Sequence, residues 1–446
     1  MKTLIARCAL PAAALIAASA MAGEAASGPH TGPSDYRIVE LDGLGGTDSS
    51  GNSINNLGMV TGYSHIASDQ HRHATLWLFG VEIDLGTLGD YDRNSNVPWP
   101  GKNNNGLIAG ISQTNEPQPR NETWSCRSFF PFATRAGFTC LGFVWENGRM
   151  RPLPTFGGDN GFATGTNDRR EVVGWAENEV EDDTCIAPQV LQFRAAIWGP
   201  GRNQMRELKP LRDHRTSAAT AINNKGQVVG ISGACGTAVG SVSARNSVIW
   251  NDGGRPKKLP DFGGIAWNTP MAINDRGEVS GFANLSADDG AAFNAQAFFW
   301  SPHSGLELIG ALEGHDVSQA LGMNIHGQVV GLSCVADFTE CRAFFWEKGR
   351  LYDLNDFVPA TYENLLVAAG DINDDGRIAG QALVSGTQEA VAVLALPTSP
   401  GAGASAPVAA AAKGTPRARA LLPAAMRQAV MARVFVSDED LRPARR

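Results

Sequence analysis

Three histidines near the start of the chain have side chains that could bind a metal ion. His71 and His73 are two residues apart, so both would lie on one face of a β-strand, and His65 precedes them in the same segment. However, His73 occupies a recurring polar position that Arg194 and Arg342 fill elsewhere in the chain. We therefore expect no bound metal and no cofactor, and we keep the three histidines only as candidates for a metal site.

A loop rich in aromatic and basic residues offers a second kind of chemistry. The segment 111–144 contains Trp124, Arg127, Phe129 and Phe130. Such side chains on a loop are typical of recognition surfaces, so we name these four as candidate binding residues. The same aromatic rings could instead pack over the end of a sheet, and both interpretations stay open.

Carboxylates offer a third kind of chemistry. Asp159, Asp261 and Asp316 lie near the junctions of the repeats described below, where they could meet as acid/base pairs. The sequence contains no GxSxG, HExxH or GxxxxGK motif. An enzyme is therefore the alternative to a binding protein, in the form of a polysaccharide hydrolase or lyase with carboxylates at a channel mouth.

Six cysteines remain once the N-terminal segment is removed, and an even number favours disulfides in an oxidising compartment. The pairs that we expect are Cys126–Cys140, Cys185–Cys235 and Cys334–Cys341. The first pair closes a loop of fifteen residues, the last is separated by seven, and the middle pair follows by elimination. Three pairs of zinc ligands are the rival interpretation, but the CxxC spacing of zinc sites is missing.

The elements that must position these residues come from a turn that occurs seven times, about fifty residues apart. It is complete in residues 222–230, which read INNKGQVVG. Its Asn recurs at Asn55, Asn103, Asn167, Asn223, Asn274, Asn324 and Asn373. Asn at the first position of a turn bonds to nearby backbone N–H groups, and Gly at the fourth accepts a positive φ. Each copy predicts a tight hairpin, although Arg170 replaces Gly in the third.

Two further elements follow each turn. One is an apolar strand ending in a tryptophan that we expect to be core, at Trp77, Trp145, Trp198, Trp250, Trp300 and Trp346. The other has the pattern Leu-x-x-Leu-Gly-Gly. The last copy lacks this second element, whereas residues 36–46 supply one at the N-terminus. Four strands per repeat predict an all-β fold, a seven-bladed β-propeller of four-stranded blades over 35–397, whose last blade is closed by the N-terminal strand.

The repeats also resemble those of the bacterial extracellular HAF-repeat family. The matching strings are His73-Ala74, Asp84 to Gly89, residues 143–150 (FVWENGRM) and residues 222–230. The resemblance covers 36–397 and implies a secreted, propeller-like protein, without catalytic residues to carry over. The sequence departs from the family pattern at Arg170, at Leu141 where the family has His, and in the last copy, which has no Trp.

Both ends of the chain differ from the repeats. Residues 1–22 have the positive start, apolar centre and small-residue cleavage site of a signal peptide. No later run of 18 apolar residues exists, so we expect no membrane span. Residues 398–446 predict a Pro/Ala-rich linker and a basic tail that is helical or disordered. The formal net charge is −8, and both ends are basic, so the body is acidic and a nucleic-acid partner is excluded.

Together these features predict a secreted bacterial protein, periplasmic or extracellular, that acts as a monomer. Its expected role is binding or interaction, with an envelope or extracellular polymer or a protein as the ligand. The alternatives are the hydrolase or lyase described above and a structural surface protein with no small ligand.

Overall fold

The computed structural model describes residues 34–122, 124–131, 133–201, 204–236, 240–251, 254–398, 420–433 and 441. The signal peptide expected at 1–22, and most of the tail expected at 398–446, lie outside these residues. The fold described here is that of the unit Ser34–Arg446.

Five sheets have four antiparallel strands each, and in every sheet the strands follow one another in chain order. The first two sheets are β6 (Ser95–Asn96), β7 (Ile108–Pro117), β8 (Phe138–Glu146), β9 (Arg149–Pro152), and β10 (Gly157–Thr166), β11 (Val172–Glu181), β12 (Leu191–Trp198), β13 (Met205–Leu208). The next two are β14 (Thr216–Ile222), β15 (Val228–Gly233), β16 (Asn246–Trp250), β17 (Pro256–Lys258), and β18 (Thr269–Ile273), β19 (Val279–Asn284), β20 (Ala295–Ser301), β21 (Gly305–Gly310). The fifth is β22 (Val317–Met323), β23 (Val329–Cys334), β24 (Cys341–Glu347), β25 (Arg350–Asp353).

The remaining strands form one eight-stranded sheet that combines the two ends of the repeat region. Its members are β1 (Tyr36–Glu40), β2 (Gly45–Ile54), β3 (Val60–Ile66), β4 (Arg72–Leu78), β5 (Val81–Asp84), β26 (Leu365–Ile372), β27 (Ile378–Leu383) and β28 (Ala390–Pro397). β1 pairs antiparallel with β28, with a register from Tyr36 opposite Pro397 to Glu40 opposite Val393. β2 meets β28 only through the parallel pair of Asp48 and Ala390. The N-terminal strand therefore joins the last repeat, as the sequence predicts.

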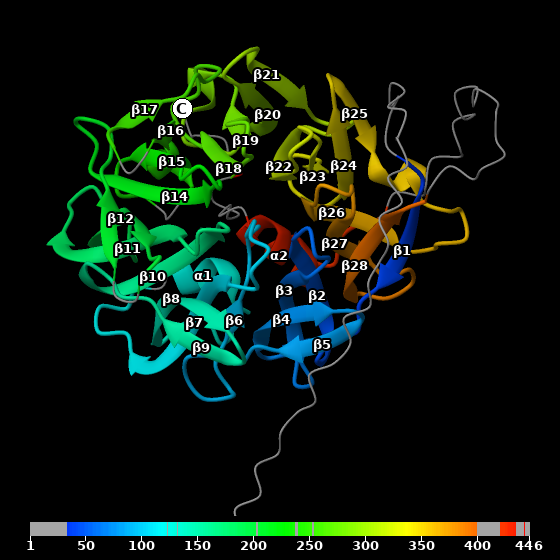
Figure 1. Cartoon of the computed structure of the whole chain (residues 1–446), viewed down its shortest axis with the longest axis horizontal. Coiled ribbons are helices and arrows are strands. Elements are labelled where there is room, and N and C mark those ends of the chain that lie inside the picture. Colours follow the sequence, from blue (N-terminus) through cyan, green and yellow to red (C-terminus); the bar gives the residue numbers. More distant parts are fainter. Residues whose placement is uncertain are drawn as a thin grey trace, which may run out of the picture. The chain divides into compact units, whose positions relative to one another are not determined.

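The sheets are arranged around a common centre, with the first strand of each repeat innermost (Figure 1). The innermost strands of successive sheets contact one another, from β10 to β14, β18, β22 and β26, and β26 also contacts β2. Radial packing of four-stranded units is the architecture of a β-propeller. The sequence prediction of an all-β propeller is confirmed at this level.

A glycine in the second strand of each repeat permits this close packing. A Cβ atom placed on Gly230 would lie 2.0 Å from the carbonyl oxygen of Ala218, and one on Gly331 would lie 1.9 Å from that of Gln319. The first strand has a register shift at this point, between Ala219 and Ala221 in one copy, which is typical of a β-bulge. The last Gly of the INNKGQVVG string is thus required by a backbone carbonyl of the neighbouring strand.

The recurring tryptophans only partly follow the prediction that all are core. Trp77, Trp198, Trp250 and Trp346 are at most 3% exposed. Trp145 and Trp300 are instead half-buried, at the ends of β8 and β20. The prediction of core tryptophans is therefore confirmed for four, and the other two pack against the core with part of the side chain exposed.

The C-terminal helix α2 (Ala424–Arg433) lies at the centre of the sheets in Figure 1. Met426, Val430 and Met431 are buried, and they belong to the same apolar cluster as Trp99 and Phe129. The helix begins directly after Pro423, a residue type tolerated where helical N–H groups have no intrahelical partner. This part of the tail is therefore helical and is packed into the core.

The other helical segments are short: α1 (Trp124–Phe129) and the 3₁₀ turns η1 (Ser241–Ala244), η2 (Ala287–Asp289) and η3 (Leu354–Phe357). Within the part of the chain that the structure describes, no helix has both the length and the apolar character needed to cross a bilayer.

Candidate functional site

The seven Asn turns are joined in a circuit by their own side chains. Asn223 Oδ1 accepts hydrogen bonds from the backbone N–H groups of Lys225 and Gln227, at 3.1 and 2.9 Å, which fixes the turn. Its Nδ2 donates to the carbonyl oxygen of Asn274 in the next turn, at 2.9 Å. The last turn closes the circuit, because Asn373 Nδ2 donates to the carbonyl oxygen of Asn55 at 3.1 Å.

One step of this circuit differs from the others. Asn103 Nδ2 donates to Thr166 Oγ1 and to the carbonyl oxygen of Leu107 instead of reaching Asn167. The backbone N–H of Asn104 makes the connection to the next turn, through Asp168 Oδ1. The amide groups of the turns are thus used within the protein, which favours the structural role of these Asn residues over a row of ligand-binding amides.

A cavity of about 70 Å³ lies where the turns meet. It is lined mainly by second-position residues of the turns and by Lys102, among them Asn56, Asn104, Asn224, Asp275 and Asp374. This volume accommodates a few water molecules and is far smaller than the roughly 300–1,000 Å³ of ligand pockets. The cavity itself is therefore smaller than a ligand pocket.

A buried ion pair supports the wall of this cavity. The Asp371 side chain is fully buried, and its Oδ1 lies 2.6 Å from Lys102 Nζ. Asp371 also accepts hydrogen bonds from the backbone N–H groups of Ile54 and Ile372. Burial raises the pKa of the Asp371 carboxyl, and the Lys102 ammonium opposes that shift. The pair connects a loop near the start of the chain to the last repeat.

The aromatic loop does not present its phenylalanines to solvent. Phe129 and Phe130 are 2% and 5% exposed, and the Phe129 ring lies 4.8 Å from that of Phe162 within the core. Arg127 is exposed on α1, and the Trp124 side chain lies outside the described residues. Of the proposed binding residues, the two phenylalanines act in packing in this structure, and Arg127 is on the surface.

The candidate metal-binding histidines are separately engaged. His73 is fully buried, its Nδ1 lies 2.8 Å from Asp84 Oδ2 and its Nε2 lies 3.0 Å from the carbonyl oxygen of Tyr91. His65 is also buried, and burial together with the Arg72 charge lowers its pKa to about 4. Burial lowers the pKa of His71 as well. Both ring nitrogens of His73 are thus engaged, and the three histidines do not form a metal-ligand cluster among the described residues.

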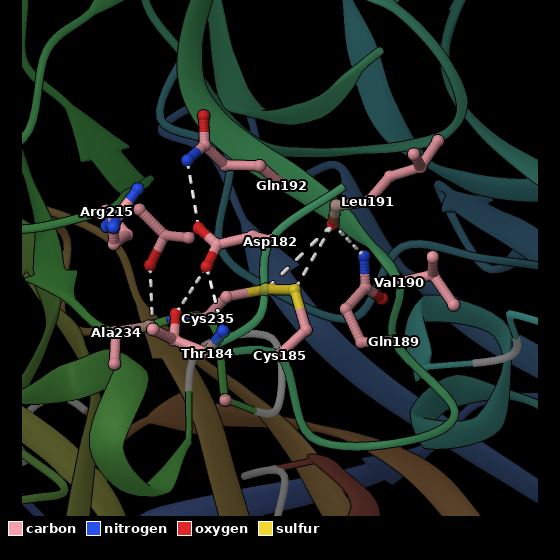
Figure 2. Close-up of a disulfide and its surroundings, with 12 residues drawn as sticks. Asp182, Thr184, Cys185, Gln189, Val190, Leu191, Gln192, Arg215, Ala234 and Cys235 are labelled. Atoms are coloured by element: carbon pink, nitrogen blue, oxygen red, sulfur yellow. Dashed lines mark hydrogen bonds between the residues drawn. A yellow bond between two sulfur atoms is a disulfide. The ribbon is translucent and has the colours of Figure 1, made fainter. Parts of the chain in front are cut away.

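The three expected disulfides are present, Cys126–Cys140, Cys185–Cys235 and Cys334–Cys341. Figure 2 shows the one that joins two sheets, between Cys185 in the β11–β12 loop and Cys235 after β15. Beside it, Asp182 accepts hydrogen bonds from Thr184 and Gln192, and Thr184 Oγ1 accepts from the backbone N–H of Cys235. The disulfide loops are therefore held by polar side chains as well as by sulfur.

The carboxylates that we expected near a common centre are engaged locally instead. Asp261 Oδ2 lies 2.9 Å from Lys258 Nζ, and Asp316 Oδ2 accepts from the backbone N–H of Ala336 at 2.9 Å. Asp159 pairs with Arg120. Nothing in these contacts brings the three aspartates together as an acid/base pair.

A groove of about 640 Å³ lies between the β14–β17 and β18–β21 sheets. Its lining residues are Gln227, Ile249, Asn251, Lys257, Lys258, Leu259, Pro260, Asp261, Gly277, Trp300 and Pro302. The volume is within the range of small-ligand pockets. A half-buried indole, two prolines and several polar side chains thus share one open surface.

Three of the recurring tryptophans, Trp77, Trp198 and Trp250, donate their indole N–H to a backbone carbonyl oxygen, whereas Trp145, Trp300 and Trp346 have no such acceptor among the described residues. Trp198 Nε1 donates to the carbonyl oxygen of Pro154 at 2.9 Å, and Trp250 Nε1 to that of Lys209 at 2.8 Å. Trp300 Nε1 has no such acceptor among the described residues, and its ring borders the groove. Sequence reasoning missed this site, since the strand around Trp300 matches its buried counterparts and only the packing of the neighbouring sheet exposes the ring.

The groove also carries polar groups at defined positions. Gln227 Nε2 donates to Asn251 Oδ1 at 3.0 Å, which orients both amides along one wall. Lys257 is exposed on β17 and has no ion-pair partner in the described part of the chain. With Lys258 paired to Asp261, the groove has a net positive charge on an otherwise acidic protein.

Comparisons with known proteins identify no family. No family model matches the chain, and no curated protein matches it. Among solved structures, the chain is similar to an acylaminoacyl peptidase from Pyrococcus horikoshii, with a TM-score of 0.42, 13% identity, and coverage of 80% of this chain and 53% of that one. The chain thus spans about half the length of that peptidase.

Two further structures are similar over most of their own length. A streptogramin B lyase has a TM-score of 0.40 and 9% identity, over 81% of this chain and 97% of that one. The β-propeller domain of the Trilobed protease from Pyrococcus furiosus has a TM-score of 0.32 and 11% identity, over 73% of this chain and 98% of that one.

Proposed function

We propose that this protein is a polysaccharide-binding module whose ligand lies in the groove beside Trp300. The observation that carries the proposal is the half-buried Trp300 ring, which borders a groove of about 640 Å³ with its indole N–H free. An indole face packs against the apolar face of a sugar ring, and its N–H can donate to a hydroxyl group. The exposed prolines beside it extend this apolar surface.

The polar groups of the groove fit the same ligand. The orientated amides of Gln227 and Asn251 can donate to and accept from sugar hydroxyls. Lys257 adds a free positive charge, which favours a polymer with carboxylate groups over a neutral one. The ligand that we infer is therefore an acidic polysaccharide of the cell envelope or its surroundings.

The wider context that we propose is a secreted bacterial propeller with seven blades, related to the HAF-repeat family. Seven linked Asn turns support the blade number, and three disulfides support an oxidising compartment. The signal-like residues 1–22 support secretion.

The experiment measures binding and turnover together. The purified oxidised protein is titrated with an acidic and a neutral polysaccharide, while the solution is analysed for released oligosaccharides. Saturable binding without products, stronger for the acidic polymer, is expected. Released products would favour the hydrolase or lyase alternative, and the absence of binding to every polymer would favour the structural surface protein.

A further inference from the structure

Three acidic side chains from separate segments converge beside the Cys185–Cys235 disulfide. They are Glu122 from the segment before α1, Asp159 in β10 and Glu177 in β11. Each offers one carboxylate oxygen such that these oxygens lie within 4.8 Å of one another. Glu122 and Glu177 are 0% exposed, so neither charge is solvated by bulk water.

The hydrogen bonds around the cluster satisfy some of these oxygens and leave others without a donor. Glu122 Oε1 accepts from the backbone N–H groups of Val190 and Leu191, at 2.8 and 2.5 Å. Glu122 Oε2 is buried and has no hydrogen-bond partner among the described residues. A buried carboxylate oxygen without a partner is costly, so its position requires an explanation.

A second buried oxygen near the cluster also lacks a hydrogen-bond donor among the described residues. Gln189 Nε2 donates to Glu177 Oε1 at 3.1 Å and to the carbonyl oxygen of Leu191, which orients the side chain beside Glu177. Gln189 Oε1 is buried and accepts no hydrogen bond within the described part of the chain. The neighbourhood therefore has an excess of oxygen acceptors over N–H donors.

The charges are also incompletely balanced. Arg120 pairs with Asp159 Oδ2, but its side chain is 41% exposed, so water screens its charge. Asn160 contributes neutral donors to Glu177, through its backbone N–H and its Nδ2. The carboxylates of Glu122 and Glu177 are both buried, and two like charges at this separation repel strongly in a buried site.

We propose that Glu122, Asp159 and Glu177 bind a calcium ion, with Gln189 Oε1 as an additional oxygen ligand. Ca²⁺ is bound by oxygen ligands at about 2.3–2.6 Å, so two of its ligands lie at most about 5 Å apart. The three carboxylate oxygens of the cluster lie within 4.8 Å of one another, so all three can bind the same Ca²⁺ ion. Mg²⁺ requires shorter bonds of about 2.0–2.1 Å and keeps several of its waters, which this enclosed site disfavours.

The role of the ion is to hold loops together, because burial excludes a polymer from Glu122 and Glu177. The ion joins the segment before α1 to β10 and β11, and Glu122 also holds the backbone of Val190 and Leu191. That backbone lies beside the disulfide in Figure 2. Calcium, through Glu122, and the disulfide thus both hold the β11–β12 loop in place.

The rival explanation is a proton held between the two glutamates. Burial and the Glu122 charge raise the pKa of Glu177 to about 7, and burial raises the pKa of Glu122. A proton on Glu122 Oε2 would remove the repulsion without a metal. The two explanations differ in their dependence on calcium.

The test uses the full-length oxidised protein, freed of metal with a chelator. Calcium chloride is titrated by calorimetry, and thermal unfolding is followed with calcium or magnesium at equal ionic strength. We expect one calcium per chain, with a dissociation constant of about 10⁻⁴–10⁻³ M, and a rise in Tm with calcium that exceeds the rise with magnesium.

Two variants locate the ion. Glu122→Gln removes one carboxylate without changing the shape of the side chain, and we expect calcium affinity to fall on the order of tenfold or more. Asp183→Asn is the matched control, because Asp183 is exposed in the β11–β12 loop, whose residues Val190 and Leu191 bond to Glu122, and Asp183 itself has no ion-pair partner among the described residues. This control retains the calcium-dependent rise in Tm.

The outcomes separate the explanations. Calcium binding that Glu122→Gln weakens and Asp183→Asn leaves unchanged supports the site. No calcium binding by the parent protein overturns the proposal and leaves the shared proton as the explanation. Equal stabilisation by the two ions, or an equal effect of the two variants, also overturns a calcium site at Glu122. If Glu122→Gln does not fold, Asp159→Asn at the half-buried edge of the cluster replaces it, and the stoichiometry measured on the parent protein still decides.

Discussion

Lys102 Nζ lies 2.6 Å from Asp371 Oδ1, although the two residues belong to opposite ends of the repeat region. Asp371 is fully buried, and Lys102 lines the cavity where the turns meet. A buried carboxylate that loses its only cationic partner retains its full desolvation cost. The pair therefore makes the stability of the last repeat depend on a residue near the start of the chain.

The first prediction follows from this pair. Lys102→Met leaves Asp371 buried and unpaired, so the free energy of unfolding should fall by about 3 kcal/mol in denaturant titrations. Lys258→Met is the control, because Lys258 is 51% exposed in its pair with Asp261 and should cost less than about 1 kcal/mol. Equal losses for the two variants would contradict the structural role of the buried pair.

A second prediction concerns the irregular turn. Arg170 has a φ of +64°, in the left-handed region that the corresponding glycines of the other turns occupy. Arg170→Gly should raise the free energy of unfolding by about 1 kcal/mol, less the small contribution of the exposed ion pair with Glu146.

The reciprocal change tests the same strain. Gly376 has a φ of +77°, and a Cβ atom there would meet only Pro397 Cγ, at 3.9 Å. Gly376→Ala should therefore lower stability by about 1 kcal/mol through backbone strain alone. A stabilising effect of this substitution would show that the turn tolerates side chains and that Arg170 is unstrained.

A pH prediction follows from His65, whose pKa is lowered to about 4 in the folded protein. In the unfolded chain the His65 imidazole takes up a proton near pH 6.5, whereas in the folded protein this imidazole stays neutral until about pH 4. The stability contribution is therefore complete above pH 6.5 and is lost as the pH falls toward 4, by up to about 3 kcal/mol. In His65→Gln the decline between these values should be shallower, as denaturant titrations of the two proteins at a series of pH values would show.

The core position of α2 gives a fourth prediction. Met426 is 3% exposed within the central apolar cluster, so Met426→Ala should lower the free energy of unfolding by about 2–4 kcal/mol. Gln428→Ala, on the exposed side of the same helix, should change it by less than about 0.5 kcal/mol. If both variants unfold like the parent, the helix does not contribute to the core in solution.

The proposed groove beside Trp300 gives a fifth prediction. Trp300→Ala removes the half-buried ring that borders the groove, and polysaccharide affinity should fall at least on the order of tenfold, as for truncation of an aromatic anchor. Trp145→Ala is the matched control, because Trp145 is half-buried at the same point of its own repeat but does not line the groove. Similar binding by the two variants would exclude the groove as the site.

The repeated elements of the fold were predictable because they depend on local chemistry. The hydrogen bonds of Asn223 lie within a few residues of the turn, and the glycine at 226 is in the expected positive-φ conformation. The pairing of β1 with β28 was predictable because the last repeat lacks a strand that the N-terminus supplies.

The candidate sites were less predictable because they depend on packing between repeats. Trp300 and Trp250 end similar strands, yet only Trp250 finds a carbonyl acceptor on its neighbour. Phe129 resembled an exposed anchor until the disulfide-closed loop placed it against Phe162. Glu122 reaches the other carboxylates through a loop whose conformation no local pattern specifies.

The pairing of Tyr36–Glu40 with Ala390–Pro397 also has a consequence for biosynthesis. Residues 36–40 are synthesised long before residues 390–397, so this sheet cannot be completed while the N-terminal part of the chain is being translated. Until β28 is made, β1 has no partner strand, and it can pair with the β28 segment of a second molecule. Exchange of this N-terminal strand between two chains is therefore the misassembly to which the newly made protein is most exposed.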